Sequence, residues 1–220
     1  CRPFAITTSS ALDWKLEPMF VVAAPGQGSQ KPGFLEPWLE IPGVPDTLQA
    51  WSDSIGVDLV THGTTSDQDT ITDTAIAQPL IVAAGIITGQ ALREALGDTT
   101  SLRFAGHSVG EFTAAALAGV LSASDALSLV AKRGQAMAVA SATTPTGMSA
   151  VIGGEISEIE TSLTSHGLFA ANFNGGGQLV IAGDKTALAE FSENPPAGTR
   201  VIPLSVAGAF HTPFMARAVE

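Results

Sequence analysis

Short apolar runs alternate with longer segments of helical hydrophobic spacing from residue 20 to residue 139. The runs FVVAA and SLRFAG, at residues 20–24 and 101–106, predict buried strands that lead into tight loops. Strands that alternate with helices indicate a parallel sheet with helices on both faces. Apolar positions at helical spacing predict the helices themselves, over residues 46–55, 78–96, 109–118 and 122–139.

The helix expected at residues 78–96 is unusually apolar. No charged residue stands between Thr74 and Leu92, so length and composition alone could suit a membrane span. Glutamine, glycine, threonine and proline residues dilute the segment, which favours a helix buried inside the protein. Pro79 is tolerated in the first turn of such a helix, and Gly97 is its expected stop.

The hydrophobic pattern changes after residue 141. Four strands and two helices are predicted in the order βαββαβ, which is the order of a ferredoxin-like unit. The strands fall at residues 147–154, 168–174, 178–183 and 199–205, and the helices at residues 155–165 and 184–191. We therefore predict a larger α/β domain, residues 19–141 and 207–220, with an inserted ferredoxin-like subdomain at residues 142–206.

Composition narrows the class of protein and of partner. Hydrophobic residues make up 45% of the 220 residues and charged residues 14%, as expected for a globular chain with a real core. Ten Lys and Arg residues against 21 Asp and Glu give a net charge of −11, so neither nucleic acid nor an anionic membrane is an expected partner. The single cysteine, Cys1, excludes an internal disulfide framework and a cysteine metal cluster, and no metal site is expected.

The two ends of the sequence carry their own expectations. Residues 1–18 lack the apolar segment of a signal peptide, and Met19 directly precedes the first predicted strand. We interpret Met19 as the natural start and residues 1–18 as a non-native or disordered extension. A helix start follows His211 only a few residues before the last one, so we interpret the sequence as C-terminally truncated.

The first sign of chemistry is the sequence GHSVG at residues 106–110. A serine in G-x-S-x-G between a strand and a helix is the nucleophile-elbow pattern, in which the serine is exposed at a strained turn. The simpler interpretation is a glycine-rich turn in which Ser108 caps the following helix. Because short motifs recur by chance, this one leaves both interpretations of Ser108 open.

A serine nucleophile needs a base, and the sequence offers four histidines. His107 adjoins Ser108 and should point elsewhere on an elbow. His62 in a polar loop and His166 at the end of a surface helix are most simply solvated. His211 lies in a small-residue loop after a buried strand, where open α/β sheets bind ligands. We therefore predict His211 as the base over a merely hydrogen-bonded loop histidine, although no Asp or Glu near it completes a triad.

Two further features suit acyl chemistry. The loop APGQGSQ at residues 24–30 does not match a dinucleotide-binding motif, and its backbone N–H groups could form an oxyanion hole. Arg133 stands inside a largely apolar helix. It is either a side chain that snorkels to water or a clamp that binds a carboxylate with two hydrogen bonds.

Seven motifs follow one another in a fixed order: APGQGSQ, AQPLIVAAG, AGHSVGEFTAAALAGVLS, AKRGQAM, GMSAVIGG, NFNGGGQLVIAG and VAGAFHTPFM. From Met19 to the end, the chain resembles the malonyl-CoA:acyl carrier protein transacylases of type II fatty-acid synthesis, in their actinobacterial form. The resemblance implies an α/β-hydrolase-like parallel-sheet core with an inserted ferredoxin-like subdomain. It also implies an S-malonyltransferase that passes a malonyl group from coenzyme A to the phosphopantetheine thiol of acyl carrier protein, with no bound cofactor.

The resemblance assigns the reacting groups. Ser108 corresponds to the nucleophile and His211 to its base. Gln27 and Val109 correspond to the residues whose backbone N–H groups form the oxyanion hole, and family members usually carry Leu where Val109 stands. They also extend well past this sequence, and that part supplies a backbone carbonyl that orients the histidine.

The resemblance also assigns the substrate pocket. Arg133 corresponds to the residue that holds the malonyl carboxylate, and Gln78 to a pocket-lining residue. Asn174 matches a position near the active site. Phe210, beside the base, is expected to narrow the pocket against α-branched acyl groups.

These assignments predict a cytoplasmic monomer that meets acyl carrier protein transiently. Since the carrier is acidic and this chain is too, docking requires a local basic cluster, for which the candidates are Lys132, Lys185, Arg200 and Arg217. Other functions stay open: transfer of another acyl group in polyketide synthesis, a serine thioesterase or hydrolase, or a non-catalytic carrier-binding fragment.

Overall fold

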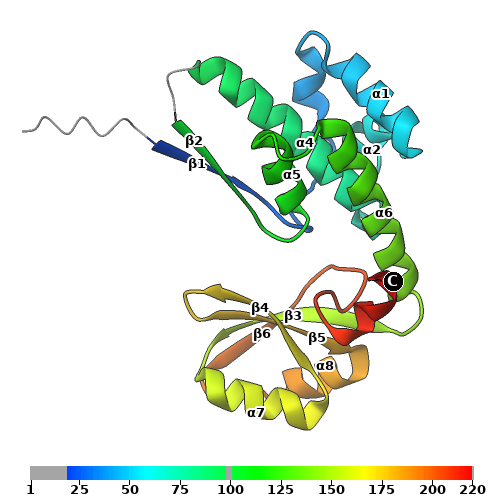
Figure 1. Cartoon of the computed structure of the whole chain (residues 1–220). Helices are drawn as coiled ribbons and strands as arrows, with labels where there is room; N and C mark the ends of the chain where they lie inside the picture. The colour runs from blue at the N-terminus through cyan, green and yellow to red at the C-terminus, as the bar shows by residue number, and fades with distance from the viewer. Residues whose placement is uncertain (1–18, 98–100, 220) are drawn as a thin grey trace, which may run out of the picture.

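The computed structural model describes residues 19–97 and 101–219, in two regions that meet at the end of helix α6 (Ala123–Ser141; Figure 1). The interpretations of Cys1 and of residues 1–18 lie outside the described residues. We call residues 19–141 the helical region, residues 142–206 the sheet region and residues 207–219 the return segment. The return segment lies against the lower end of α6, between the two regions (Figure 1).

The helical region surrounds one pair of parallel strands. Strands β1 (Met19–Ala24) and β2 (Ser101–Gly106) pair along their whole length, so that Ala24 lies opposite Gly106. Both strands were predicted, but the large apolar residues at the start of β1 are exposed rather than covered by helices. The helices are η1 (Glu36–Glu40), α1 (Val44–Ile55), α2 (Leu59–Thr64), α3 (Gln68–Thr72), α4 (Thr74–Leu96), α5 (Gly110–Leu117) and α6 (Ala123–Ser141).

Helix α4 is the centre of the helical region's core. It begins four residues earlier than predicted, because the side chain of Asp73 accepts a hydrogen bond from the Ala75 N–H and caps it. Pro79 therefore lies inside the helix and not in its first turn. The helix is long and apolar enough to cross a membrane, and 61% of its most apolar stretch is buried inside the protein, which confirms the predicted buried helix.

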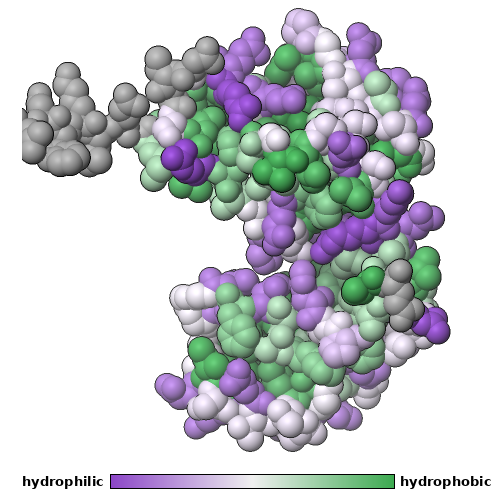
Figure 2. Space-filling model, in the orientation of Figure 1, coloured by the Kyte–Doolittle hydropathy of each residue, from purple (hydrophilic) through white to green (hydrophobic). Residues whose placement is uncertain are grey.

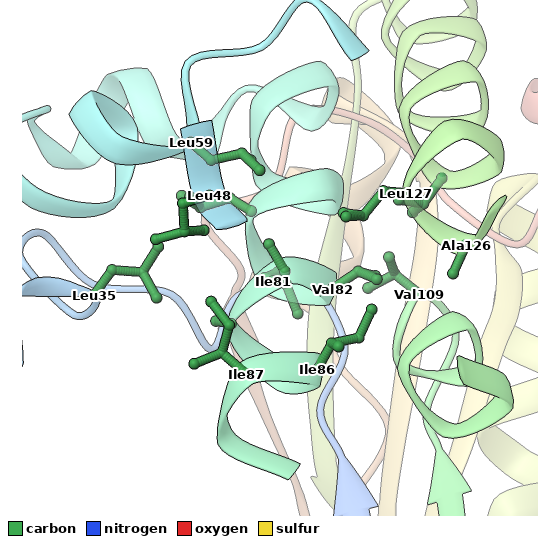
Figure 3. Packing of buried hydrophobic residues seen from close by; sticks show 14 of the residues in the cluster. Leu35, Leu48, Leu59, Ile81, Val82, Ile86, Ile87, Val109, Ala126 and Leu127 are labelled. Atoms are coloured by element: carbon green, nitrogen blue, oxygen red, sulfur yellow. The ribbon is translucent and has the colours of Figure 1, made fainter. Parts of the chain in front are cut away.

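The packing around α4 explains that burial (Figure 3). Side chains from all around the helix meet neighbours from the η1 and α1–α2 segments on one side and from α5 and α6 on the other. Burial of each large aliphatic side chain contributes about 1.5–3 kcal/mol, so the cluster stabilises the whole region. Its labelled members are Leu35, Leu48, Leu59, Ile81, Val82, Ile86, Ile87, Val109, Ala126 and Leu127.

The sheet region has the predicted βαββαβ order. Its elements are β3 (Thr146–Gly153), α7 (Ile156–His166), β4 (Phe169–Gly175), β5 (Gln178–Asp184), α8 (Lys185–Glu193) and β6 (Thr199–Pro203). The strands are antiparallel in the order β4-β5-β3-β6, which confirms the ferredoxin-like arrangement. Helices α7 and α8 cover one face of the sheet (Figure 1). Alternate residues such as Val180 and Ala182 pack on the other face, against Met137 of α6 and Phe210 of the return segment.

Candidate active site

Ser108 sits on a strained turn between β2 and α5. Its backbone φ is 53°, and Ser108 and His211 are the two non-glycine residues with positive φ in the described part of the chain. A Cβ atom at Gly106 would collide with the backbone of Gly110, and one at Gly110 would collide with the carbonyl of Ala24. The interpretation of Ser108 as a helix cap is wrong, because Val109 holds the N-cap position of α5 and no side chain caps that helix.

The structure brings His211 to Ser108 across 103 residues of sequence. The Oγ atom of Ser108 lies 2.9 Å from Nε2 of His211, which suits a neutral imidazole that accepts the serine proton. His211 belongs to the return segment, and its own φ is 59°. Within the described residues, Ser108 is the one hydrogen-bond partner of the His211 ring.

Two of the other three histidines, His62 and His166, differ from their predicted surroundings. His62 lies in helix α2 and not in a loop, with Nδ1 2.9 Å from Oγ of Ser66. His166 is half-buried against the edge of the Phe191 ring and is not simply solvated. His107 lines the same cavity as Ser108.

Burial, together with neighbouring positive charge, lowers the pKa of His211 and so favours its neutral, basic form. Burial lowers the pKa of His211, and the positive charge of Arg133 and the nearby His107 lower it further. The carboxylate of Glu111 acts in the opposite direction and raises that pKa. Because burial and the positive neighbours prevail, His211 is neutral near pH 7 and ready to accept a proton.

Arg133 places a cationic fork beside the nucleophile. Its Nη1 donates to Oε1 of Gln78 at 2.6 Å, and its Nη2 donates to Oγ of Ser108 at 3.3 Å. Burial lowers the pKa of Arg133 and Glu111 raises it, yet an arginine stays charged. No described carboxylate forms an ion pair with this guanidinium. A charged fork that faces only neutral oxygens is suited to bind an anion next to Ser108.

Gln78 fixes the direction of that fork. Its side chain is 1% exposed, and its Nε2 donates to the sulfur of Met137 at 3.2 Å while its Oε1 accepts from Arg133. The amide therefore has a partner on each side, in a place where an unpaired polar group would be costly.

Two residues that line the cavity with Ser108, Gln27 and Val109, have backbone N–H groups without hydrogen-bond partners among the described residues. The Gln27 side chain is held by hydrogen bonds from its Nε2 to the Thr72 carbonyl and the Thr74 hydroxyl. Both Gln27 and Val109 line the cavity that Ser108 enters. Unpaired N–H groups beside a nucleophile are the groups that an oxyanion hole requires.

The site opens into a cavity of about 200 Å³ between the helical and sheet regions. Figure 2 shows the surface hollowed between the two halves, with hydrophilic side chains along part of the hollow. Drug-sized ligands occupy about 300–1,000 Å³, so this space suits a short acyl group. All eight predicted residues line it or bond within it: Gln27, Gln78, Ser108, Val109, Arg133, Asn174, Phe210 and His211.

Sequence reasoning missed most of the lining that the sheet region provides. Asn174 was expected near the site, where it is exposed and donates from Nδ2 to Oε1 of Gln178. The alternation of residues along the strands could have indicated the rest, but not which face meets the helical region. The missed residues of the sheet region are Met148, Asn172, Val180, Leu204 and Val206, and those of the helical region are Met137 and His107.

No group of three or more His, Cys, Asp or Glu side chains in residues 19–97 and 101–219 is arranged to hold a metal ion.

Comparisons with known proteins agree with this geometry. The acyl transferase domain family matches residues 20–220. The malonyl CoA-acyl carrier protein transacylase of Mycobacterium tuberculosis is 52% identical over 203 residues, which cover 92% of this chain and 67% of that protein. The Mycolicibacterium smegmatis protein of the same name is 50% identical over 84% of this chain and 64% of its own length.

Solved structures are similar as well. The crystal structure of MCAT from Mycobacterium tuberculosis superimposes with a TM-score of 0.87 at 51% identity, covering 92% of this chain and 67% of that one. A malonyl-transacylase in complex with a type II PKS acyl-carrier protein gives a TM-score of 0.82 at 31% identity, covering 91% of this chain and 67% of that one.

Proposed function

The chain belongs to the acyl transferase family and, within it, to the malonyl CoA-acyl carrier protein transacylases, and on that premise we propose how its own residues carry out the transfer. Ser108 accepts a malonyl group from malonyl-CoA and passes it to the phosphopantetheine thiol of an acyl carrier protein in fatty-acid biosynthesis. One observation carries the proposal. The Oγ atom of Ser108 lies within hydrogen-bond distance of both His211 and Arg133.

The first half-reaction forms an ester on Ser108. Nε2 of His211 takes the hydroxyl proton while Oγ attacks the thioester carbonyl carbon. The N–H groups of Gln27 and Val109 hold the oxyanion, and each such donor is worth roughly 100- to 1,000-fold in rate. The intermediate collapses, the carbon–sulfur bond breaks, and the coenzyme A sulfur leaves with the proton from His211.

The second half-reaction runs the same steps with a new thiol. His211 takes the proton of the carrier's phosphopantetheine thiol, and the sulfur attacks the malonyl ester. Ser108 leaves and regains the proton from His211. Coenzyme A and the carrier's prosthetic group are substrates in this scheme, which calls for no resident cofactor.

Arg133 accounts for selection of a malonyl group. The free carboxylate of malonyl stands one methylene from the thioester carbonyl, and Nη2 of Arg133 lies 3.3 Å from the oxygen that attacks that carbonyl. A guanidinium binds a carboxylate with two parallel hydrogen bonds. An acetyl group leaves the half-buried charge of Arg133 without that partner, which disfavours acetyl-CoA.

The carrier surface, the oligomeric state and the location in the cell stay predictions. The four candidate docking residues Lys132, Lys185, Arg200 and Arg217 are all exposed. They come from α6, α8, β6 and the return segment. Docking through them, by a monomer in the cytoplasm, predicts a transfer rate that falls as salt concentration rises.

The test is a transfer assay with the intact protein, malonyl-CoA and a phosphopantetheinylated acyl carrier protein. We expect malonyl on the carrier thiol by mass spectrometry, and none with Ser108→Ala. Release of free malonate at the same rate with and without the carrier would contradict the proposal and identify a hydrolase instead. Ser108→Ala that still loads the carrier would remove Ser108 from the reaction.

A further inference from the structure

Among the described residues, no carboxylate forms a hydrogen bond with the ring of His211 at Ser108. Its ring bonds to Ser108 Oγ and to no other described group. Its backbone adopts φ 59°, a left-handed conformation that is strained for a residue with a Cβ atom. Such strain persists only where the surrounding structure enforces it, so the residues on either side of His211 have to be firmly anchored.

Two buried threonines, Thr146 and Thr212, provide that anchor through hydrogen bonds to the backbone of Ala209 in the return segment. The N–H of Ala209 donates to Oγ1 of Thr146 at 3.0 Å, and the carbonyl of Ala209 accepts from Oγ1 of Thr212 at 2.6 Å. Ala209 is fully buried, and Thr146 is 3% and Thr212 9% exposed. Both polar groups of Ala209 are therefore satisfied by hydroxyls in a place that offers them little water.

These contacts bracket His211. Ala209 lies two residues before it and Thr212 directly after it, while Thr146 opens strand β3, 63 residues away from Ala209 in sequence. Thr212 also caps the helix η2 (Pro213–Ala218) by accepting the Phe214 N–H at 3.3 Å. The Thr146 hydroxyl thus bonds the return segment to the sheet region before His211, and the Thr212 hydroxyl bonds it to helix η2 after His211.

The other side of the segment is fitted against helix α6. A Cβ atom at Gly208 would collide with Oγ of Ser141, the last residue of α6. The backbone of the return segment therefore approaches α6 as closely as a glycine permits. Helix α6 also carries Arg133. The fit therefore ties the backbone near His211 to the helix that orients the carboxylate-binding fork.

We propose that Thr146 and Thr212 are positioning residues for His211. By holding both polar groups of Ala209, they impose the left-handed backbone of His211 and so place its Nε2 at hydrogen-bond distance from Ser108. They touch neither substrate nor the reacting atoms. The inference rests on the proposed function only in that it assigns His211 the work of the base.

The test compares Thr146→Val with Thr146→Ser in the intact protein. Valine keeps the shape of threonine but leaves the Ala209 N–H unpaired, whereas serine keeps the hydroxyl. We expect Thr146→Val to slow malonyl transfer to Ser108 in a single turnover by about 10- to 100-fold, the range that a misplacement of about 1 Å produces. The KM for malonyl-CoA should change little, and Thr146→Ser should restore most of the rate. Thr212→Val should slow the reaction in the same way.

Thr143→Val is the matched control. Its hydroxyl also donates to the carbonyl three residues earlier, that of Ala140, at the same 2.6 Å as the Thr212 bond, and it lies at the same end of α6. It does not contact the return segment through that bond. We expect its transfer rate to equal that of the unmodified protein.

A second measurement separates this inference from the proposed function. The ring-proton NMR signal of His211 should titrate at a different pH in Thr146→Val than in the unmodified protein and in Thr146→Ser, because the ring loses its bond to Ser108. An unmodified protein that takes up no malonyl would refute the proposed function while this titration still tests the inference. Equal titrations in all three proteins, or equal losses of rate in Thr146→Val and Thr143→Val, would overturn the inference.

Discussion

The helical region and the sheet region contribute different things to one cavity. The groups to which we assign the reaction and the carboxylate, Ser108 and Arg133, come from the helical region, and the proposed base His211 comes from the return segment. The lining from the sheet region consists of amide and apolar side chains, among them Asn172 and Met148. Chemistry and shape are thus assigned to separate parts of the chain. Substitutions of cavity-lining side chains from the sheet region should therefore alter what binds, whereas substitutions of Ser108 or His211, or of the threonines that position His211, should decide whether the bound group reacts.

Backbone strain is also distributed unequally between the sheet region and the residues that meet at Ser108. In the sheet region, every described residue with positive φ is a glycine, which adopts that conformation freely. The two non-glycine exceptions in the described chain are Ser108 and His211. Non-glycine positive φ is therefore found at the two residues that we propose to react, and at no described residue of the sheet region.

Replacing the base should have the largest effect. His211→Ala removes the proton acceptor 2.9 Å from Oγ of Ser108, and losing one member of a nucleophile–base pair costs on the order of 10⁴-fold or more. The rate of Ser108 acylation by malonyl-CoA in a rapid-quench experiment measures it. A His211→Ala protein that is acylated within tenfold of the normal rate would assign the base to another group.

Removing the cationic fork should come next. Arg133→Ala is expected to lower acylation by malonyl-CoA by about 100-fold, since hydrogen bonds to charged groups contribute about 1.5–3 kcal/mol each. Acylation by acetyl-CoA should change far less, because acetyl has no carboxylate. The ratio of kcat/KM for the two substrates is the measurement, and equal losses for both would reduce Arg133 to a structural role.

A substitution in the sheet region should cost less. Asn172→Ala removes an amide from the cavity wall, and one neutral hydrogen bond is worth about 0.5–1.5 kcal/mol, or roughly 2- to 12-fold. We expect that loss in KM and not in the single-turnover rate. A fall in that rate as large as the one for Arg133→Ala would break the division between chemistry and shape.

The acidic limb of the pH–rate profile should move with Glu111. His211 reacts in its neutral form and its pKa is lowered, so the rate should rise with pH through a midpoint below the ordinary histidine value of 6.5. Glu111 raises that pKa, so Glu111→Gln should move the midpoint to still lower pH. Glu158→Gln, on the distant helix α7, is the control and should leave it in place. A midpoint that rises in Glu111→Gln would contradict the electrostatics described for the site.

The smallest effect should fall on stability alone. Asp184 caps helix α8 by accepting from the N–H groups of Thr186 and Ala187, and loss of such a cap costs about 1 kcal/mol. Asp184→Ala should lower the free energy of unfolding in urea by that amount. Its acylation rate should match that of the unmodified protein, since Asp184 does not line the cavity that Ser108 enters.

The sequence predicted the elements well where local signals are strong. The stop of α4 at Gly97 is a local feature, and it holds in the structure. The predicted start of α4 was too late because Pro79 was placed in the first turn. In the structure, the Asp73 cap determines where that helix begins. The helices α2 and α3 were missed because each is only five or six residues long.

The sequence predicted which residues form the site, but not which side chains contact one another there. Motif order indicated Ser108, His211 and Arg133, and the structure brings them together. Nothing local in the sequence shows that Gln78 bonds to both Arg133 and Met137, or that Thr146 holds the segment of His211. Such contacts join residues 55 to 63 positions apart and depend on how the regions pack.

The central claim is that Ser108 carries a malonyl group selected by its carboxylate. The most direct measurement is mass spectrometry of the intact protein after brief exposure to equal concentrations of malonyl-CoA, acetyl-CoA and methylmalonyl-CoA, followed by peptide mapping. We predict a single malonyl adduct on the peptide that contains Ser108. An adduct on any other residue, or acetyl on Ser108 in an amount equal to malonyl, would contradict the account.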